Sequence, residues 1–230
     1  MNQSVQNYPG LAGGGALAAD RNRVLRNTYW LLALSMVPTV LGAWIGVQTG
    51  IARAMSPGIG LMVFLVGAFG FMFAIEKFKN SAAGVPMLLG FTFFMGLMLS
   101  RLISVVLATS GPGVIMMAFG GTAAIFLTMA SLSSVIKRDL GNMGKFLTIG
   151  AIMLFVALLA NFFLQSPALM IVLAVLGMGI FSAFILYDLR RVRDGDETNY
   201  ITATLGVYLS IYTVFQFMLA LLGIGGSSDD

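Results

Sequence analysis

The residues that most often carry protein chemistry are scarce in this chain of 230 residues. It contains no cysteine and no histidine, which excludes thiol nucleophiles, thiolate or imidazole metal ligands and every mechanism with a histidine base. Glu76 and Asp188 are carboxylates beside apolar segments, and no second aspartate within such a segment completes an aspartyl-protease pair. No phosphate-binding or dinucleotide-binding glycine motif occurs with its flanking elements. We therefore expect a protein that is not an enzyme and that has no cofactor and no metal site.

Asp188 follows a long apolar run and precedes Arg190 and Arg191. One interpretation is a carboxylate paired with these arginines, and an exposed pair of this kind stabilises by less than about 1 kcal/mol. The other interpretation is a functional carboxylate. Glu76 is placed similarly, just before Lys77. The acidic stretch 194–197 lacks the ordered spacing of a calcium loop and indicates a solvated loop.

Arg101 is unusual because it lies inside an apolar run, about seven residues or roughly 10 Å from its end. An arginine at that depth is costly unless its side chain extends to the interface or finds a partner. Gln216 and Asn161 fall at a similar depth, so a polar cluster with Arg101 is the second interpretation. The terminal Asp229 and Asp230 are candidates for its counter-charge.

Seven apolar runs position these polar residues, and each is long enough to cross a bilayer. A hydrocarbon core of about 30 Å needs about 20 helical residues, and the backbone groups of a spanning segment must be satisfied within the helix. The sequence therefore predicts an all-α fold, a single bundle of seven transmembrane helices in the lipid bilayer. The predicted spans are 29–49, 57–75, 85–108, 114–135, 146–164, 167–187 and 201–224.

The basic residues predict the orientation of this bundle. Eleven of the thirteen Lys and Arg residues fall on one side when the connections are counted alternately, and only Arg53 falls on the other. Positive residues concentrate in cytoplasmic loops, so the N-terminus is expected in the cytoplasm and the C-terminus in the periplasm. The same rule explains the net charge of +4 without any nucleic-acid partner.

Three regions are expected along the chain. Residues 1–28 form a flexible cytoplasmic tail, because their glycine-rich stretch 10–15 favours an irregular structure and a signal-peptide pattern is absent. Residues 29–224 form the transmembrane domain, and 225–230 form a short periplasmic tail.

Four short strings resemble those of a known family: 120–122 (Gly-Gly-Thr), 137–140 (Lys-Arg-Asp-Leu), 161–163 (Asn-Phe-Phe) and 185–188 (Ile-Leu-Tyr-Asp). With the seven predicted spans, they resemble the Bax inhibitor-1 family of seven-helix membrane proteins over nearly the whole chain. This resemblance implies the family's bundle fold.

Three further strings are similar to one bacterial branch of that family, whose members modulate the membrane-bound AAA protease FtsH. They are 23–29 (Arg-Val-Leu-Arg-Asn-Thr-Tyr), 163–169 (Phe-Leu-Gln-Ser-Pro-Ala-Leu) and the motif Glu197, Thr198, Asn199 and Tyr200 followed by an isoleucine. The branch implies a protein of the bacterial inner membrane that binds FtsH and slows its degradation of other membrane proteins. A cytoplasmic tail of about 28 residues, extending up to about 3.3 Å per residue, would reach into a protease pore.

The family resemblance also implies an alternative function. Some members resemble pH-sensitive calcium leaks, in which an aspartate at the position of Asp188 shares a proton with a second aspartate on the seventh helix. Here the second position is Ser210, and Glu76 or a neighbour replaces a basic residue expected near the end of the second span. The paired-carboxylate switch therefore cannot operate in its usual form. A leak for calcium or protons is still the alternative function to the binding of FtsH.

Overall fold

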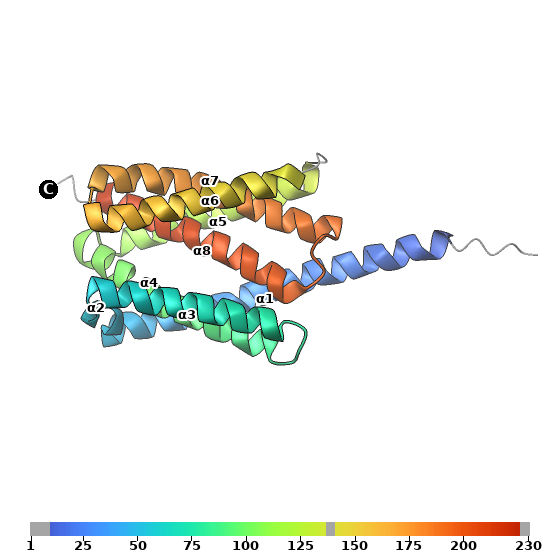
Figure 1. The fold of residues 1–230 in the computed structure, drawn as a ribbon, viewed down its shortest axis with the longest axis horizontal. Helices are drawn as coiled ribbons and strands as arrows, with labels where there is room; N and C mark the ends of the chain where they lie inside the picture. The colour runs from blue at the N-terminus through green and yellow to red at the C-terminus, as the bar shows by residue number, and fades with distance from the viewer. Residues whose placement is uncertain (1–9, 137–140, 226–230) are drawn as a thin grey trace, which may run out of the picture.

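The chain folds into a bundle of long helices in a computed structural model (Figure 1) that describes residues 10–136 and 141–225. Side chains are described for residues 19–136 and 142–224. The described residues form helices and connections without a strand. The helices are α1 (Gly10–Thr49), α2 (Ile51–Ala54), α3 (Pro57–Phe78), α4 (Gly84–Thr109), α5 (Pro112–Val135), α6 (Gly141–Leu164), α7 (Pro167–Asp194) and α8 (Tyr200–Gly225).

Seven of these helices, all except α2, are long and apolar enough to cross a membrane. The prediction of an all-α polytopic membrane protein is thus confirmed. The short helix α2 was not predicted, and it begins after Gly50, whose φ of 67° breaks the end of α1. Proline at the first position of α3 and α7 matches the predicted starts at 57 and 167, because a missing N–H costs nothing there. Helix α5 also begins with a proline, Pro112, two residues before its predicted start at 114.

The first helix begins well before residue 29, where the first span was predicted to start. Helix α1 begins at Gly10, and its first turns project from the end of the bundle. Glycine disfavours a helix by up to about 1 kcal/mol per residue, but alanine, leucine and arginine dominate residues 16–26 and favour one. The flexibility predicted for residues 1–28 remains a prediction, and residues 1–9 and the C-terminal segment 226–230 lie outside the described residues.

Helix α7 also continues beyond its predicted end at residue 187. It ends at Asp194, where Gly195 adopts a φ of 90° and donates its N–H to the carbonyl of Arg191. A left-handed glycine is the usual stop for a helix, and the basic residues of the last turn interact favourably with the helix dipole. Asp188 therefore lies within α7 and not at its end.

Helix α8 is the centre of the bundle. It packs against α1 and α4 on one side and against α5 and α7 on the other, as Figure 1 shows. Its residues Val207, Tyr208, Val214 and Leu219 are almost completely buried. Helices α3 and α6 lie at the periphery, against α4 and α7 respectively, and expose large apolar side chains such as Phe73 and Phe146. Those exposed faces are the surface that lipid is expected to cover.

Helices α1 and α4 approach so closely that their backbones touch. A Cβ on Gly42 would clash with the carbonyl oxygen of Phe93, and a Cβ on Gly96 would clash with the carbonyl oxygen of Thr39. One turn further along, Gly46 faces the side chain of Ser100. Small residues four apart on both helices are the usual means by which membrane helices pack at short distance.

Candidate functional site

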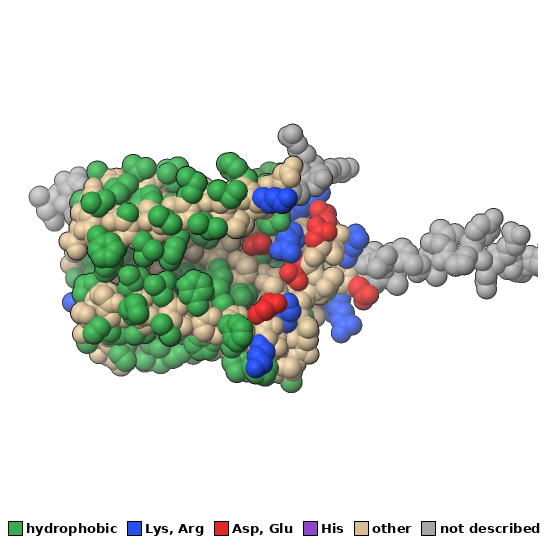
Figure 2. Space-filling model, viewed as in Figure 1, with side chains coloured by type: hydrophobic (Ala, Val, Ile, Leu, Met, Phe, Trp, Pro, Cys, Tyr) green, Lys and Arg blue, Asp and Glu red, His purple; other side chains and the backbone are tan. Residues whose placement is uncertain are grey.

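Charged side chains gather at one end of the bundle, which we call the charged end. It comprises the α3–α4 and α7–α8 connections, the last turns of α7 and the part of α1 before Thr28. Figure 2 shows acidic and basic side chains together there, beside a long surface that is mainly apolar. Seven of the basic residues that the charge count grouped on one side lie in these segments: Arg21, Arg23, Arg26, Lys79, Arg190, Arg191 and Arg193.

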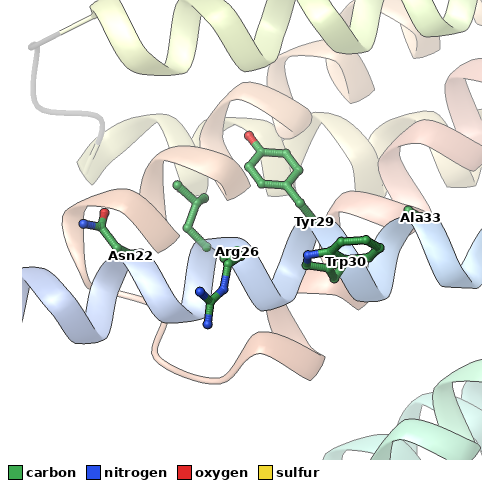
Figure 3. Close-up of a pocket in the computed structure, with 6 residues that line it drawn as sticks. Asn22, Arg26, Tyr29, Trp30 and Ala33 are labelled. Carbon is green, nitrogen blue, oxygen red and sulfur yellow. The ribbon is translucent and has the colours of Figure 1, made fainter.

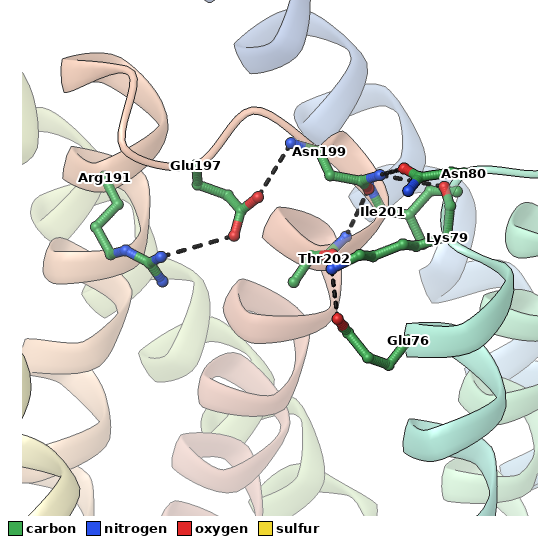
Figure 4. Close-up of polar contacts among 8 residues, drawn as sticks. All are labelled: Glu76, Lys79, Asn80, Arg191, Glu197, Asn199, Ile201 and Thr202. Carbon is green, nitrogen blue, oxygen red and sulfur yellow. Dashed lines mark hydrogen bonds and ion pairs between the residues drawn. The ribbon is translucent and has the colours of Figure 1, made fainter.

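Asn199 holds two connections of the charged end together. Its Oδ1 accepts hydrogen bonds from the backbone N–H groups of Ile201 at 2.9 Å and Thr202 at 3.2 Å, which caps the start of α8. Its Nδ2 donates to Oδ1 of Asn80 at 2.9 Å and to the carbonyl of Lys79 at 3.1 Å. One side chain therefore joins the α7–α8 connection to the α3–α4 connection (Figure 4).

Glu197 extends this network toward α7. Its carboxylate accepts from the backbone N–H of Asn199 at 3.0 Å and lies 3.7 Å from the guanidinium of Arg191. Thr198 is exposed, and Tyr200 is half-buried against the main core. The motif 197–200 thus caps α8 and fixes the turn that precedes it.

Asp188 lies between α7 and α8. A Cβ on Gly206 of α8 would come within 3.1 Å of its Oδ2, so the glycine leaves room for the carboxylate. Arg191 and Glu197 are near enough to act on its charge. Ser210, one turn deeper on α8, is 3% exposed.

The ion pair considered between Asp188 and Arg190 or Arg191 is not present among the described residues. Arg190 instead pairs with Asp194 at 2.8 Å and donates to the carbonyl of Ser133, while Arg191 pairs with Glu197. Glu76 pairs with Lys79, three residues further along the chain. The pairs Glu76–Lys79 and Arg190–Asp194 are local in sequence because charged side chains one helical turn apart meet most easily.

The polar cluster predicted around Arg101 is also not formed. Arg101 donates to the carbonyl of Met55 at 3.5 Å, in the α2–α3 connection at the end opposite the charged end. Asn161 accepts from the backbone N–H of Ser166 at 3.1 Å and caps the α6–α7 turn, and Gln216 donates to the hydroxyl of Tyr212 at 3.3 Å. This contact fits the interpretation in which the Arg101 side chain extends toward the membrane interface. Asp229 and Asp230, the candidates for its counter-charge, lie outside the described residues.

Sequence reasoning missed a polar stripe on α8, formed at every fourth position by Thr204, Tyr208, Tyr212 and Gln216. The Tyr208 hydroxyl lies 2.9 Å from that of Thr39 on α1 and donates to the carbonyl of Thr92 on α4 at 3.4 Å. Tyr212 donates to the carbonyl of Met95 on α4 at 3.0 Å. The spacing of four in an otherwise apolar helix was the available signal, because it places the four side chains on one helix face.

Thr204 completes this stripe at the charged end, where its hydroxyl lies 3.4 Å from the carbonyl of Thr28 on α1. The stripe therefore connects α8 to both α1 and α4, and we call these three helices the α1–α4–α8 core. Among the described residues, no three carboxylate, histidine or cysteine side chains gather as metal ligands would.

Seven long apolar helices with polar residues buried between them define the class: this is a polytopic α-helical membrane protein. The sequence pattern of the family described as "Inhibitor of apoptosis-promoting Bax1" matches residues 21–227. The chain therefore belongs to the Bax inhibitor-1 family, which confirms the predicted resemblance. The string 137–140 that contributed to it lies outside the described residues.

Individual relatives place the chain close to the predicted branch. It is 35% identical to "Modulator of FtsH protease YccA" of Escherichia coli K12, over 88% of this chain and 90% of that protein. The same figures hold for "Inner membrane protein YccA" of Escherichia coli O6:H1. An "Uncharacterized membrane protein" of Vibrio cholerae is 35% identical over 91% of this chain and 93% of that protein.

Proposed function

We propose that this protein binds an FtsH-type protease in the bacterial inner membrane and slows the degradation of other membrane proteins. It acts in this proposal as a binding partner and not as an enzyme. The similarity to two relatives, one named a modulator of FtsH protease and one an inner membrane protein, supports both parts. The overlap with each relative covers 88% of this chain, so the similarity is not confined to one segment of it.

The proposal places the charged end and the N-terminus in the cytoplasm. Eleven of the thirteen basic residues belong to that side by the charge count, and cytoplasmic loops are enriched in Lys and Arg. The N-terminal turns of α1 and the last turns of α8 lie at opposite ends of the bundle (Figure 1), so the C-terminus belongs to the periplasmic side.

In this arrangement α1 is the segment that a cytoplasmic protease would pull. Its first turns project from the charged end, and residues 1–9 precede them. A protease that extracts membrane proteins from an exposed end would load α1 before any other helix. The resistance of the whole protein to degradation would then depend on how firmly α1 is held.

The observation that carries the proposal is the attachment of α1 within the α1–α4–α8 core. Its backbone touches that of α4 at Gly42 and Gly96, and it meets α8 through Thr39 and Thr28. Removing α1 would expose buried hydroxyls and carbonyls of three helices, each of which is costly to leave unpaired in hydrocarbon. A protein that engages the protease but resists extraction would occupy it and so protect other substrates.

Co-purification from native membranes tests the binding step. Proteolytically inactive FtsH is captured with either the full-length protein or a variant lacking residues 1–20. We expect the full-length protein to be retained and the truncated variant to be lost. Equal retention of both forms would contradict a role for the N-terminal segment, and loss of both would contradict the binding of FtsH itself.

One observation favours a cation leak as the second candidate. Asp188, at the position where the family resemblance implies the first aspartate of a leak, lies between α7 and α8 against Gly206. Ser210 in place of the second aspartate weakens this candidate. A leak would therefore have to depend on Asp188 alone. Calcium flux into proteoliposomes, with Asp188→Asn as the comparison, tests this candidate, which fails if both proteins give the flux of empty liposomes.

A further inference from the structure

A groove runs along one face of α1 at the charged end (Figure 3). Its lining residues recur every three or four positions, so they share one side of the helix. Polar residues line its outer part, and aromatic and small apolar residues line its inner part. The lining residues are Asn22, Leu25, Arg26, Tyr29, Trp30 and Ala33.

The inner part of the groove exposes an aromatic surface that the described protein does not cover. Trp30 is 73% exposed, although the neighbouring Leu31 and Leu32 are buried in the core. Tyr29 forms a firm side wall, because its ring packs edge-on against that of Phe126 on α5 at 6.4 Å between centroids. Tryptophan and tyrosine are enriched where a membrane helix passes from hydrocarbon to headgroups.

The outer part of the groove has an excess of positive charge. Among the described residues, the acids Glu76, Asp194 and Glu197 are already paired with Lys79, Arg190 and Arg191. On α1 itself, the one acid Asp20 is outnumbered by three arginines, at 21, 23 and 26. The arginines on α1 form no ion pair within the described part of the chain, and Arg26 is exposed at the groove. Arg193 on α7 is near enough to act electrostatically on Tyr29, and its Nη1 is buried without a hydrogen-bond acceptor among the described residues. An anion is the ligand that complements this charge.

We infer that this groove binds an anionic phospholipid, with its phosphate against Arg26 and Asn22 and an acyl chain along Trp30 and Ala33. The lining extends over twelve residues, from Asn22 to Ala33, or about 16 Å of helix, from a cationic end to an apolar one. A phospholipid makes the same transition from charge to hydrocarbon along its own length. A soluble anion would leave Trp30 exposed, and an apolar helix would leave Arg26 unpaired. Basic pockets beside membrane helices bind anionic headgroups in this way.

The two tryptophans of the chain allow a direct test. Both lie on α1 and both are largely exposed, but Trp44 is fourteen residues further along, near the opposite end. Trp44→Phe leaves Trp30 as the only tryptophan, and Trp30→Phe leaves Trp44. Each full-length variant is placed in phosphatidylcholine vesicles that contain a fixed fraction of brominated phosphatidylglycerol or of brominated phosphatidylcholine, and tryptophan quenching is measured.

Trp30 is expected to be quenched more strongly by the brominated anionic lipid, and Trp44 equally by both lipids. One basic residue near an anionic headgroup corresponds to about fivefold enrichment of that lipid. Arg26→Gln should abolish the preference at Trp30. Arg53→Gln, at an exposed arginine of α2, should preserve it and serves as the matched control.

Three results would overturn the inference, and none depends on the binding of FtsH. Equal quenching of Trp30 by both lipids would show that the groove meets bulk lipid. A preference that survives Arg26→Gln would show that another group selects the headgroup. Protection of Trp30 from both lipids would show that a protein surface, such as a second copy of the chain, covers the groove.

Discussion

Tyr208 joins three helices through one hydroxyl group. It belongs to α8, lies 2.9 Å from the hydroxyl of Thr39 on α1 and donates to the carbonyl of Thr92 on α4. Its side chain is 1% exposed, so water does not replace a partner that is lost. Interhelical hydrogen bonds in membranes contribute modestly, about 0.6 kcal/mol on average and up to about 2 kcal/mol.

Tyr208→Phe is therefore expected to lower the free energy of unfolding by about 1 kcal/mol, because it removes this hydroxyl and little volume. The midpoint of denaturation by sodium dodecyl sulfate in mixed micelles measures the change. Tyr187→Phe is the control, since Tyr187 is only half-buried. Equal midpoints for the two variants would contradict the account of the α1–α4–α8 core.

Asn199 likewise joins separate elements through the hydrogen bonds of one side chain, here at the charged end. Its amide caps α8 and reaches both Asn80 and the carbonyl of Lys79, so one substitution removes four hydrogen bonds. Asn199→Ala is expected to cost about 1–2 kcal/mol, the upper range for loss of a helix cap. Faster amide exchange in residues 79–84 would show that the α3–α4 connection is released, and the neighbouring Thr198→Ala should leave it unchanged.

At the scale of helices, the α1–α4 contact depends on the absence of side chains. A Cβ on Gly42 would meet the backbone of Phe93, which cannot move aside as a flexible side chain can. Gly70 on α3 has no neighbouring atom within 4 Å of such a Cβ. Both positions lie in helices, so alanine improves the helix propensity at each by a similar amount.

Gly42→Ala should consequently be less stable than Gly70→Ala by about 1–3 kcal/mol, the usual cost of overpacking. The same denaturation midpoints measure this difference. Gly42→Ala should also shorten the half-life of the protein in cells that contain FtsH, because α1 is held less firmly. If the two variants unfold at the same midpoint, the α1–α4 contact does not hold α1 as we describe.

The helices themselves could largely be predicted from the sequence, because long apolar runs leave a membrane segment few alternatives. The errors lie at the polar flanks of α1 and α7. Residues 10–28 extend α1 before its apolar run, and residues 188–194 extend α7 beyond its own run. Hydropathy gives no signal in these segments, and their glycine and charged residues favour a later start for α1 and an earlier end for α7.

The partners of the candidate residues could not be predicted in this way. Arg101, Asn161 and Gln216 share a depth in the sequence pattern, but the structure gives each a different partner in a different part of the fold. Depth follows from position along a helix, whereas proximity depends on the order and rotation of the helices. Asp188 illustrates the same point, since its contact with Gly206 depends on how α7 and α8 pack.

For the whole molecule, the two proposals use different parts of α1. The first turns project from the charged end and would engage the protease, and the middle of the helix is held between α4 and α8. The groove around Trp30 lies between these parts, at the expected membrane surface. A protein built in this way would be easy to engage and difficult to extract.

The rate at which FtsH degrades a second membrane protein tests this account most directly. FtsH, ATP and a membrane substrate are reconstituted in liposomes with the full-length protein, with the variant lacking residues 1–20, or with neither. We predict that the full-length protein slows loss of the substrate and is itself degraded slowly, while the truncated variant gives the rate seen without either protein. An unchanged rate of substrate loss with the full-length protein would contradict the account.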